Sequence, residues 1–285
     1  MPTTLSSRHA GRLERSCKRP LDSIRFGPST HGLERAEVYL TTWAFEPHRH
    51  DTYGIGITTS GVQTFRYRGA RRVCLPGQLH ILHPDETHDG APASDGGFGY
   101  RILYIAPQLV RDAIGGDDLP FVADPVQEAT PAARPMAVLL ANIDEPLSEL
   151  SCADIAASIA DSLLALSGRP AGRPTPIDLR AVAAVRDYLA AYPREQTPAS
   201  VLEAIAGVDR FTIARHFRRA FGTSPDRYRA RRRLDLARAA IESGQSLAQA
   251  ASESGFADQS HMTRHFKKTY GLTPGRWITL TTHQQ

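Results

Sequence analysis

The sequence predicts a two-domain α+β chain, with a β-rich N-terminal domain and an all-α C-terminal domain. Between residues 36 and 106, short segments rich in Val, Ile, Tyr, Phe and Thr are broken by Gly and Pro, which is typical of strands. From Pro131 onward, apolar residues recur at helical spacing. Within the helical part, residues 215–228 are repeated at residues 264–277. Two copies of one helical module are therefore expected.

The segments that read as strands are close together in the chain. Several of them in about 70 residues favour a sandwich or a small barrel. Their ranges are 36–45, 53–61, 62–69, 71–84 and 98–107.

The helical region between residues 131 and 167 carries one apolar stripe, formed by Ile155, Ile159, Leu163 and Leu166. This stripe is either the contact between two copies of the chain or a surface that packs on its own domain. The next segment, 168–176, has three prolines and two glycines in nine residues and is predicted to be a linker.

Four segments follow from these patterns. Residues 1–20 are basic, lack the apolar core of a secretory signal, and are expected to be a flexible arm. Residues 21–167 form the N-terminal domain with its helices, 168–176 the linker, and 177–285 the helical domain.

Composition limits the function. The mean hydropathy is −0.32 and no run approaches 18 apolar residues, so we expect a cytoplasmic protein without a membrane partner. Three widely spaced cysteines, Cys17, Cys74 and Cys152, suit reduced thiols and argue against a disulfide framework or a cysteine zinc site.

Charge is divided unevenly along the chain. The net charge is +4, but residues 175–285 contain 17 Arg and Lys against 10 Asp and Glu, whereas the remainder is mildly acidic. A basic C-terminal third indicates a polyanionic partner for that domain.

Each copy of the repeat has the plan of a helix-turn-helix motif. A short helix, 199–206 or 247–254, is followed by a glycine-containing turn and a second helix, 210–221 or 258–270. In such motifs the second helix enters the major groove of DNA. The segment 224–243 between the copies is expected to be one long helix that holds them about one turn of DNA apart.

The apolar spacing of each second helix predicts which side chains face DNA. Ile213, Phe217 and Phe221 pack inward in the first copy, and Met262, Phe266 and Tyr270 in the second. Arg can read guanine and Gln can read adenine. A solvated basic face is the alternative. The predicted DNA-binding residues are Arg210, Phe211, Ala214, Arg215, Arg218, Gln259, Ser260, Thr263, Arg264 and Lys267.

The C-terminal hundred residues resemble the DNA-binding domain of the AraC/XylS family of bacterial transcription regulators. The shared motif is spread over Ala251, Gly255, Phe256, Asp258, Gln259, Ser260, His261, Arg264, Phe266, Lys267, Gly271, Thr273 and Pro274. Met262 stands where that family usually has an aromatic residue, and Trp277-Ile278 where it has Tyr-Arg. The resemblance implies seven helices with two helix-turn-helix motifs, binding near promoters.

Histidines at positions 48, 50 and 88 resemble the two histidine motifs of the cupin barrel. Many AraC-like regulators carry a cupin-like sensor, so the resemblance implies an N-terminal cupin-like β-barrel that binds a small-molecule effector. Gly54 stands where metal-binding cupins have a glutamate, so we expect a pocket without metal or other cofactor. The candidate effector-binding residues are Trp43, His48, His50, Tyr53, His88 and Tyr104.

These expectations combine into one functional hypothesis. The chain is expected to be a transcription regulator and not an enzyme, with duplex promoter or operator DNA and a small effector as ligands. The helices at 131–167 would make it a homodimer, and RNA polymerase is a further candidate partner. The alternative is a metal-dependent cupin enzyme with a helical appendage.

Overall fold

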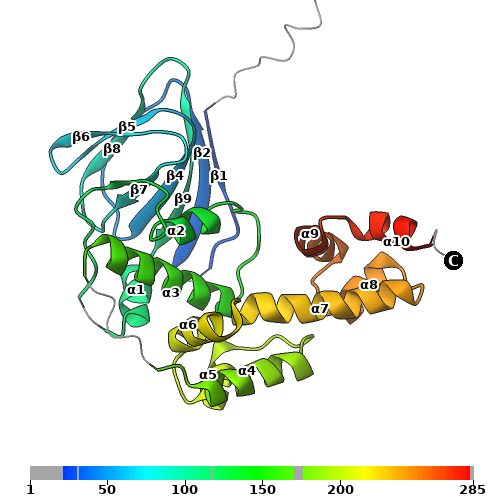
Figure 1. The fold of residues 1–285 in the computed structure, drawn as a ribbon. Helices are drawn as coiled ribbons and strands as arrows, with labels where there is room; N and C mark the ends of the chain where they lie inside the picture. The colour runs from blue at the N-terminus through cyan, green and yellow to red at the C-terminus, as the bar shows by residue number, and fades with distance from the viewer. Residues whose placement is uncertain (1–21, 31, 117, 170–175, 283–285) are drawn as a thin grey trace, which may run out of the picture. The chain divides into compact units, whose positions relative to one another are not determined.

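The computed structural model describes residues 22–30, 32–116, 118–169 and 176–282 (Figure 1). The predicted arm at 1–20 and most of the predicted linker at 168–176 lie outside the described residues. The chain divides into two units, which are described separately: one holds residues up to 107 and 122–145, the other residues 108–121 and 146 onward. No helix in the described segments is both long and apolar enough to span a membrane.

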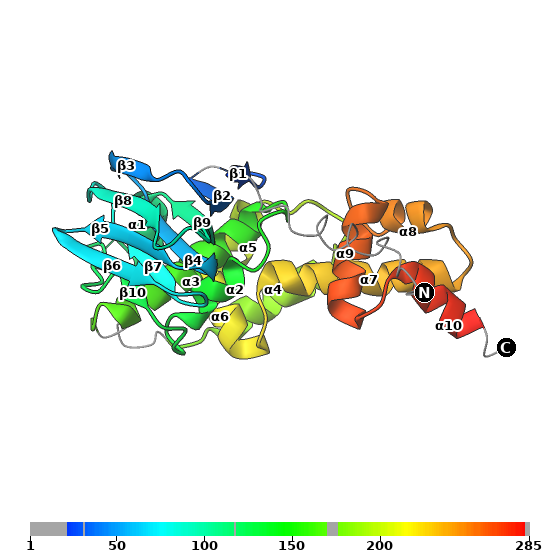
Figure 2. The same ribbon diagram turned by 90° about the horizontal axis from the view of Figure 1, so that it is seen from above.

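In its described residues, the N-terminal unit contains two antiparallel sheets and one short helix (Figures 1 and 2). The larger sheet has the strand order β1-β2-β9-β4-β7-β10, and the smaller has the order β3-β8-β5-β6. The elements are β1 (Ser23–Phe26), β2 (Leu33–Leu40), β3 (Phe45–His48), β4 (Tyr53–Gly61), β5 (Gln63–Tyr67), β6 (Ala70–Cys74), β7 (Leu79–Leu82), β8 (His88–Pro92), β9 (Phe98–Ile105), β10 (Val126–Gln127) and α2 (Arg134–Leu139). The predicted cupin-like, β-rich fold is confirmed, although the described strands form two sheets and not one closed barrel.

The core of this unit lies around β9, which pairs along its length with β2 on one side and β4 on the other. Phe98, Tyr100 and Ile102 of β9 pack with Ala36 and Val38 of β2. Because β9 is central and buried, its sequence is almost continuously apolar. The strand β8 was not predicted, since its sequence HDGAP has the Gly and Pro of a loop and little β propensity.

Two glycines of β4 make room for histidine rings. A Cβ on Gly56 would overlap the buried ring of His80, and a Cβ on Gly54 would lie 3.4 Å from Cε1 of His50. Ile55 is buried between them. The alternation of Gly and Ile in β4 therefore sets the space available between the two sheets.

The second unit is helical. Seven of its helices, α4 to α10, follow residue 177, as the resemblance implied. Their bounds, with those of two preceding helices, are α1 (Pro107–Ala113), α3 (Glu149–Leu166), α4 (Leu179–Ala191), α5 (Ala199–Ala206), α6 (Arg210–Phe221), α7 (Pro225–Glu242), α8 (Leu247–Glu253), α9 (Gln259–Tyr270) and α10 (Pro274–Thr282).

The two helix-turn-helix motifs are α5–α6 and α8–α9, and the second helix of each has a capping residue at both ends. Asp209 accepts hydrogen bonds from the backbone amides of α6, and Asp258 does so for α9. Both helices end at a glycine with positive φ, Gly222 at 69° and Gly271 at 77°. Ser224 caps α7 with proline following at the first helical position.

Each motif has a core of its own. Ile213 and Phe217 are buried in the first, and Met262 and Phe266 in the second, as predicted. The helix α7 joins the cores, and Figure 1 shows α4, α5 and α6 gathered at one end of it and α8 and α9 at the other. With 18 residues, α7 is about 27 Å long.

The helix α3 packs with the first motif, an arrangement that the sequence does not indicate. Leu150 of α3 belongs to the core of that motif, and α3 lies along α6. Three residues of the predicted stripe, Ile155, Ile159 and Leu163, are buried within the single chain. In this arrangement the stripe is not an exposed seam for a second copy.

Candidate functional site

The predicted groove-facing side of α9 is open. Gln259, Ser260, Arg264 and Lys267 are exposed, while Thr263 is half-buried. Among the described residues, the side chains of Arg264 and Lys267 form no hydrogen bond or ion pair, and Lys267 is bonded only through its backbone. The opposite side is anchored by Met262 and Phe266, so α9 presents a polar and basic face on a fixed support.

The corresponding side of α6 is covered by carboxylates. Arg215 Nε lies 2.7 Å from Asp161 of α3, and its Nη2 donates to the carbonyl oxygen of Ala113 at 2.6 Å. Arg218 pairs with Asp154 of α3.

The third arginine of α6 is also paired. Arg210 pairs with Glu149 of α3 and, at 2.8 Å, with Glu203 of α5. The hydrogen bond from Arg210 lowers the pKa of Glu203, which keeps that carboxylate charged. All three arginines predicted to contact DNA from α6 therefore hold a carboxylate of α3.

Two apolar residues predicted to face DNA from α6 are buried in this arrangement. Phe211 is 8% exposed and Ala214 is 2% exposed. They cannot reach a DNA groove while α3 lies along α6. The residue pattern alone does not reveal this, because both stand at positions that the helical period directs away from the core of the motif.

In the N-terminal unit, three of the predicted effector-binding histidines come together. The ring centroids are 4.5 Å apart for His48 and His88, 4.7 Å for His50 and His88, and 5.8 Å for His48 and His50. His48 ends β3 and His88 begins β8, where the two residues are direct cross-strand partners. His50 stands in the loop before β4, with the ring of Tyr104 edge-on at 5.1 Å.

A cavity of about 40 Å³ lies between the two sheets beside these histidines. His48, His88 and Tyr104 line it, together with residues that were not predicted. The additional lining residues are Phe45, Gln63, Phe65, His80, Leu82, Asp89, Gly90, Tyr100 and Ile102. The period of two along β9 relates Tyr100 and Ile102 to Tyr104 and is the signal that would have found them.

His80 is the most deeply buried polar group in this cavity. The residue is 1% exposed, and neither ring nitrogen has a hydrogen-bond partner among the described residues. Burial lowers the pKa of His80 to about 3 and that of His88 to about 4, so both rings are neutral near pH 7. The neighbouring His83 differs, because its Nε2 accepts from the amide of Val122 at 3.0 Å.

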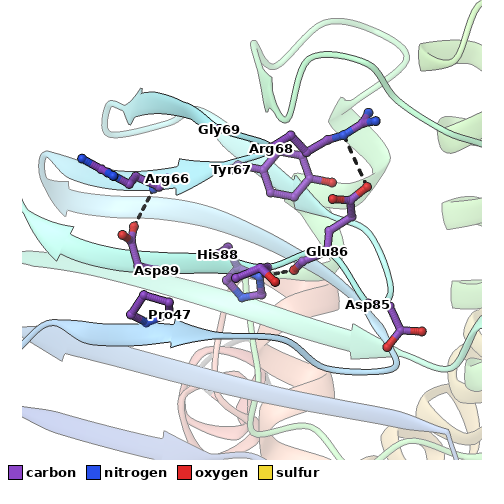
Figure 3. A pocket seen from close by; sticks show the side chains of 10 residues that line it. Pro47, Arg66, Tyr67, Arg68, Gly69, Asp85, Glu86, His88 and Asp89 are labelled. Atoms are coloured by element: carbon purple, nitrogen blue, oxygen red, sulfur yellow. Dashed lines mark hydrogen bonds and ion pairs between the residues drawn. The ribbon is translucent and has the colours of Figure 1, made fainter.

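A larger and more open pocket, of about 340 Å³, shares His88 and Asp89 with the inner cavity (Figure 3). Its walls are the β5–β6 turn, the loop before β8 and Pro47. Charged side chains of both signs line it, including Arg68, whose Nε lies 3.3 Å from Glu86. His88 therefore borders both the inner cavity and the outer pocket.

Three of the predicted effector-binding residues, Trp43, His50 and Tyr53, line neither space. Trp43 is 71% exposed and stands in the bend before β3. Tyr53 is 1% exposed and packs edge-on against His83, with ring centroids 5.5 Å apart. Because alternate residues of a strand face opposite sides, Tyr53 is directed away from the side on which Gly54 approaches His50.

Comparison with known proteins gives the class of protein to which the chain belongs. Residues 30–164 match the model of the AraC-like ligand binding domain, and residues 202–279 match the model of a helix-turn-helix domain. The two matched regions define a DNA-binding regulator with a ligand-binding domain. The chain belongs to the AraC family of transcriptional regulators.

Similar proteins are found among curated proteins and solved structures. The chain is 26% identical over 228 residues to an uncharacterized HTH-type transcriptional regulator of Bacillus subtilis, YbfI, covering 76% of this chain and 81% of that protein. ToxT from Vibrio cholerae is 13% identical, with a TM-score of 0.38 over 87% of this chain and 98% of ToxT. A probable AraC family transcriptional regulator from Rhodopseudomonas palustris is 25% identical, with a TM-score of 0.33 over 35% of this chain and 94% of that protein.

Proposed function

We propose that the chain is an effector-controlled regulator that contacts operator DNA through α9 directly, and through α6 only after α6 has separated from α3. The contrast between the two helices carries this proposal. The basic face of α9 is exposed, whereas every arginine on the equivalent face of α6 holds a carboxylate.

On α9, the exposed residues divide by chemistry. Gln259 and Ser260 stand at the start of the helix, from which base edges are read, and Arg264 stands one turn later. Lys267 stands in the last turn of α9 and suits a phosphate. We therefore assign sequence preference to Gln259 and Arg264, and general affinity to Lys267.

On α6, the carboxylates of α3 occupy the places that DNA phosphates would take. An arginine that pairs with Asp154 or Asp161 cannot at the same time neutralise a phosphate, so DNA and α3 compete for α6. Any ligand that binds more tightly to the separated state than to the paired state shifts the population toward DNA binding. The effector in the N-terminal unit is the proposed source of that difference, since α3 follows this unit directly in the chain.

The remaining partners are proposed from the class of protein. A second copy of the chain would bind the second half of an operator, and RNA polymerase would be contacted at the promoter. A regulator that acts on chromosomal DNA works in the cytoplasm. We assign binding, and not catalysis, to the cavity, because the family is one of regulators.

The test is binding of the full-length protein to its own upstream region, by footprinting with competitor DNA present. Arg264→Ala is expected to weaken binding and to relax the preference at one base pair, a loss of about 1–3 kcal/mol for a base contact. Lys267→Ala is expected to weaken binding to all sequences alike and to reduce the salt dependence by about one phosphate contact.

A charge-matched control is Arg186→Ala on α4, which removes one positive charge from a residue paired with its neighbour Asp187. If the two α9 variants bind no more weakly than this control, the assignment of the α9 face is wrong.

A further inference from the structure

We propose that the loop between α4 and α5 is a rigid brace between the two helix-turn-helix motifs, held in place by Arg233 of α7. The brace restricts the chain to operators with one spacing between the two DNA segments that α6 and α9 contact. This restriction rests on the proposed function, whereas the brace itself does not. Its residues, Arg194, Arg233 and Gly255, lie outside the faces of α6 and α9 that are assigned to DNA.

In the described residues, the apolar cores of the two motifs do not join along α7. The first core reaches Tyr228 of α7, and the second begins at Leu234. The five residues between them, 229–233, are four arginines and one alanine. Long helices are rarely straight, so α7 alone would leave the angle between the motifs free to vary. Another contact is needed to fix that angle.

Arg233 connects this stretch of α7 to the loop between α4 and α5. Its Nε donates to the carbonyl oxygen of Pro193 at 2.6 Å. Its Nη2 donates to the carbonyl oxygens of Arg194 at 3.2 Å and Glu195 at 3.1 Å. The donors of a guanidinium have fixed directions, so bonds to three successive carbonyls fix the loop relative to the helix.

The charge of Arg233 is committed to this loop. The three other arginines of the stretch each pair with a carboxylate of α7, whereas Arg233 has no ion pair among the described residues. Burial lowers the pKa of Arg233 to about 10, which leaves the side chain charged near pH 7. A partly desolvated charge needs polar partners, and the three loop carbonyls provide them.

The same loop meets the second motif at Gly255, in the turn between α8 and α9. A Cβ on Gly255 would lie 2.8 Å from both Cα and the carbonyl oxygen of Arg194, so only glycine allows this approach of the two backbones. Arg194 is therefore held twice, because its carbonyl oxygen accepts from Arg233 and its backbone lies against Gly255. A change in the angle between the motifs would disrupt one contact or the other.

A fixed angle between α6 and α9 has a consequence for DNA. Each base pair inserted between the two contacted segments moves the second by about 3.4 Å and turns it by about 35°. A rigid pair of motifs cannot follow this change and loses one set of contacts. The expected loss of affinity is about 100-fold, because the second module no longer binds at high effective concentration.

The brace is tested without DNA, by measuring a distance between two spin labels in the full chain. The labels are attached at Ala204→Cys of α5 and Ser252→Cys of α8, both exposed positions, after the three native cysteines are replaced by alanine. We expect a narrow distance distribution in this chain and a broader one when Arg233→Ala is added. Circular dichroism checks the fold of each variant.

Two further variants make the distance measurement decisive. Arg233→Lys keeps the charge but lacks the planar fork, so it should also broaden the distribution, and it replaces Arg233→Ala if that variant does not fold. Arg238→Ala is the control, because Arg238 pairs only with Glu242 of the same helix and should leave the distribution narrow. Equal widths with and without the fork of Arg233 overturn the brace.

Operator spacing tests the consequence for DNA. The parent is the chain with Asp154→Asn and Asp161→Asn, which neutralises two α3 carboxylates that pair with α6. Its affinity is measured for the footprinted operator and for the same operator with one base pair inserted between the two protected segments. We expect the insertion to cost the parent about 100-fold, but to cost the parent carrying Arg233→Ala less than about 10-fold.

The outcomes separate the brace from the proposed function. Equal losses with and without Arg233→Ala, or no loss in the parent, overturn the role in operator spacing. Absence of operator binding by both the wild type and the parent contradicts the proposed function and leaves the distance measurement standing.

Discussion

Neutralising the two α3 carboxylates that face Arg215 and Arg218 should release α6 for DNA. The perturbation is Asp154→Asn with Asp161→Asn, which keeps the shape of each side chain and removes its charge. The side chains in these two ion pairs are between 12% and 46% exposed, so solvent screens them. Exposed pairs contribute about 0.2–1 kcal/mol each, and two such pairs give about 0.5–2 kcal/mol.

That free energy sets the size of the effect. If the state with α6 free is a minor one, destabilising the paired state by about 0.5–2 kcal/mol raises the apparent DNA affinity by about 2- to 30-fold. Each arginine that reaches a phosphate also steepens the dependence of log affinity on log salt by about 0.9. The assay is fluorescence anisotropy of a labelled operator duplex at several salt concentrations.

The control separates release of α6 from a simple loss of negative charge. Asp187→Asn with Glu242→Gln also removes two carboxylates that pair with arginines on exposed helix surfaces. Circular dichroism checks that both double variants are folded. Equal affinity and equal salt slope for the two would refute the idea that α3 masks α6.

Two further predictions concern residues that stabilise the fold around the two sites. Gly56→Ala should destabilise the N-terminal unit by about 1–3 kcal/mol, because the new methyl group overlaps the buried His80 ring. The control is Gly275→Ala, whose methyl group meets no neighbour and should not destabilise the protein. Urea unfolding measures both variants, and equal unfolding midpoints would show that the His80 ring moves aside. Burial by itself would raise the pKa of Asp226, but Arg229 and the hydroxyl groups of Ser148 and Ser151 lower it below its usual value. Its folded-state pKa therefore lies below the unfolded value of about 3.9, so its contribution to stability is complete above that pH and is lost as the pH falls through the folded pKa. The difference in unfolding free energy between wild type and Asp226→Asn should accordingly shrink on acidification from pH 6 to pH 3, and a constant difference would contradict this reasoning.

Local patterns in the sequence determined most of the helical unit. Four-residue spacing of Met262 and Phe266 defines the buried side of α9, and that of Ile213 and Phe217 defines the buried side of α6. These features depend on neighbours within one or two turns, so they can be read without the fold. The sequence repeat supports the same interpretation, because both copies place apolar residues on one side of the helix and basic residues on the other. The strands with high β propensity were found for the same reason, and β8 was missed because it lacks that propensity.

Local sequence patterns and tertiary structure together define the cavity. Histidine spacing indicated that His48, His50 and His88 belong together, and their rings do cluster. Of the predicted set, however, Trp43, His50 and Tyr53 line neither the cavity nor the outer pocket. Which face of a strand a residue occupies depends on register, and register depends on pairing between distant strands. The position of His80 in the cavity depends on the pairing of β7 with β4, because Gly56 of β4 leaves space for its ring.

The sequence by itself determined the class of protein, the two helix-turn-helix motifs and the exposed polar side of α9, because each follows from residues close together in the chain. Tertiary structure alone decided that α3 pairs its carboxylates with the arginines of α6 and that three histidines from β3, β8 and the loop before β4 converge. Pairs such as Asp154 with Arg218 lie 64 residues apart, and no local period relates them. Their meeting is fixed by how the helices pack, and the convergence of the histidines by how the strands pair.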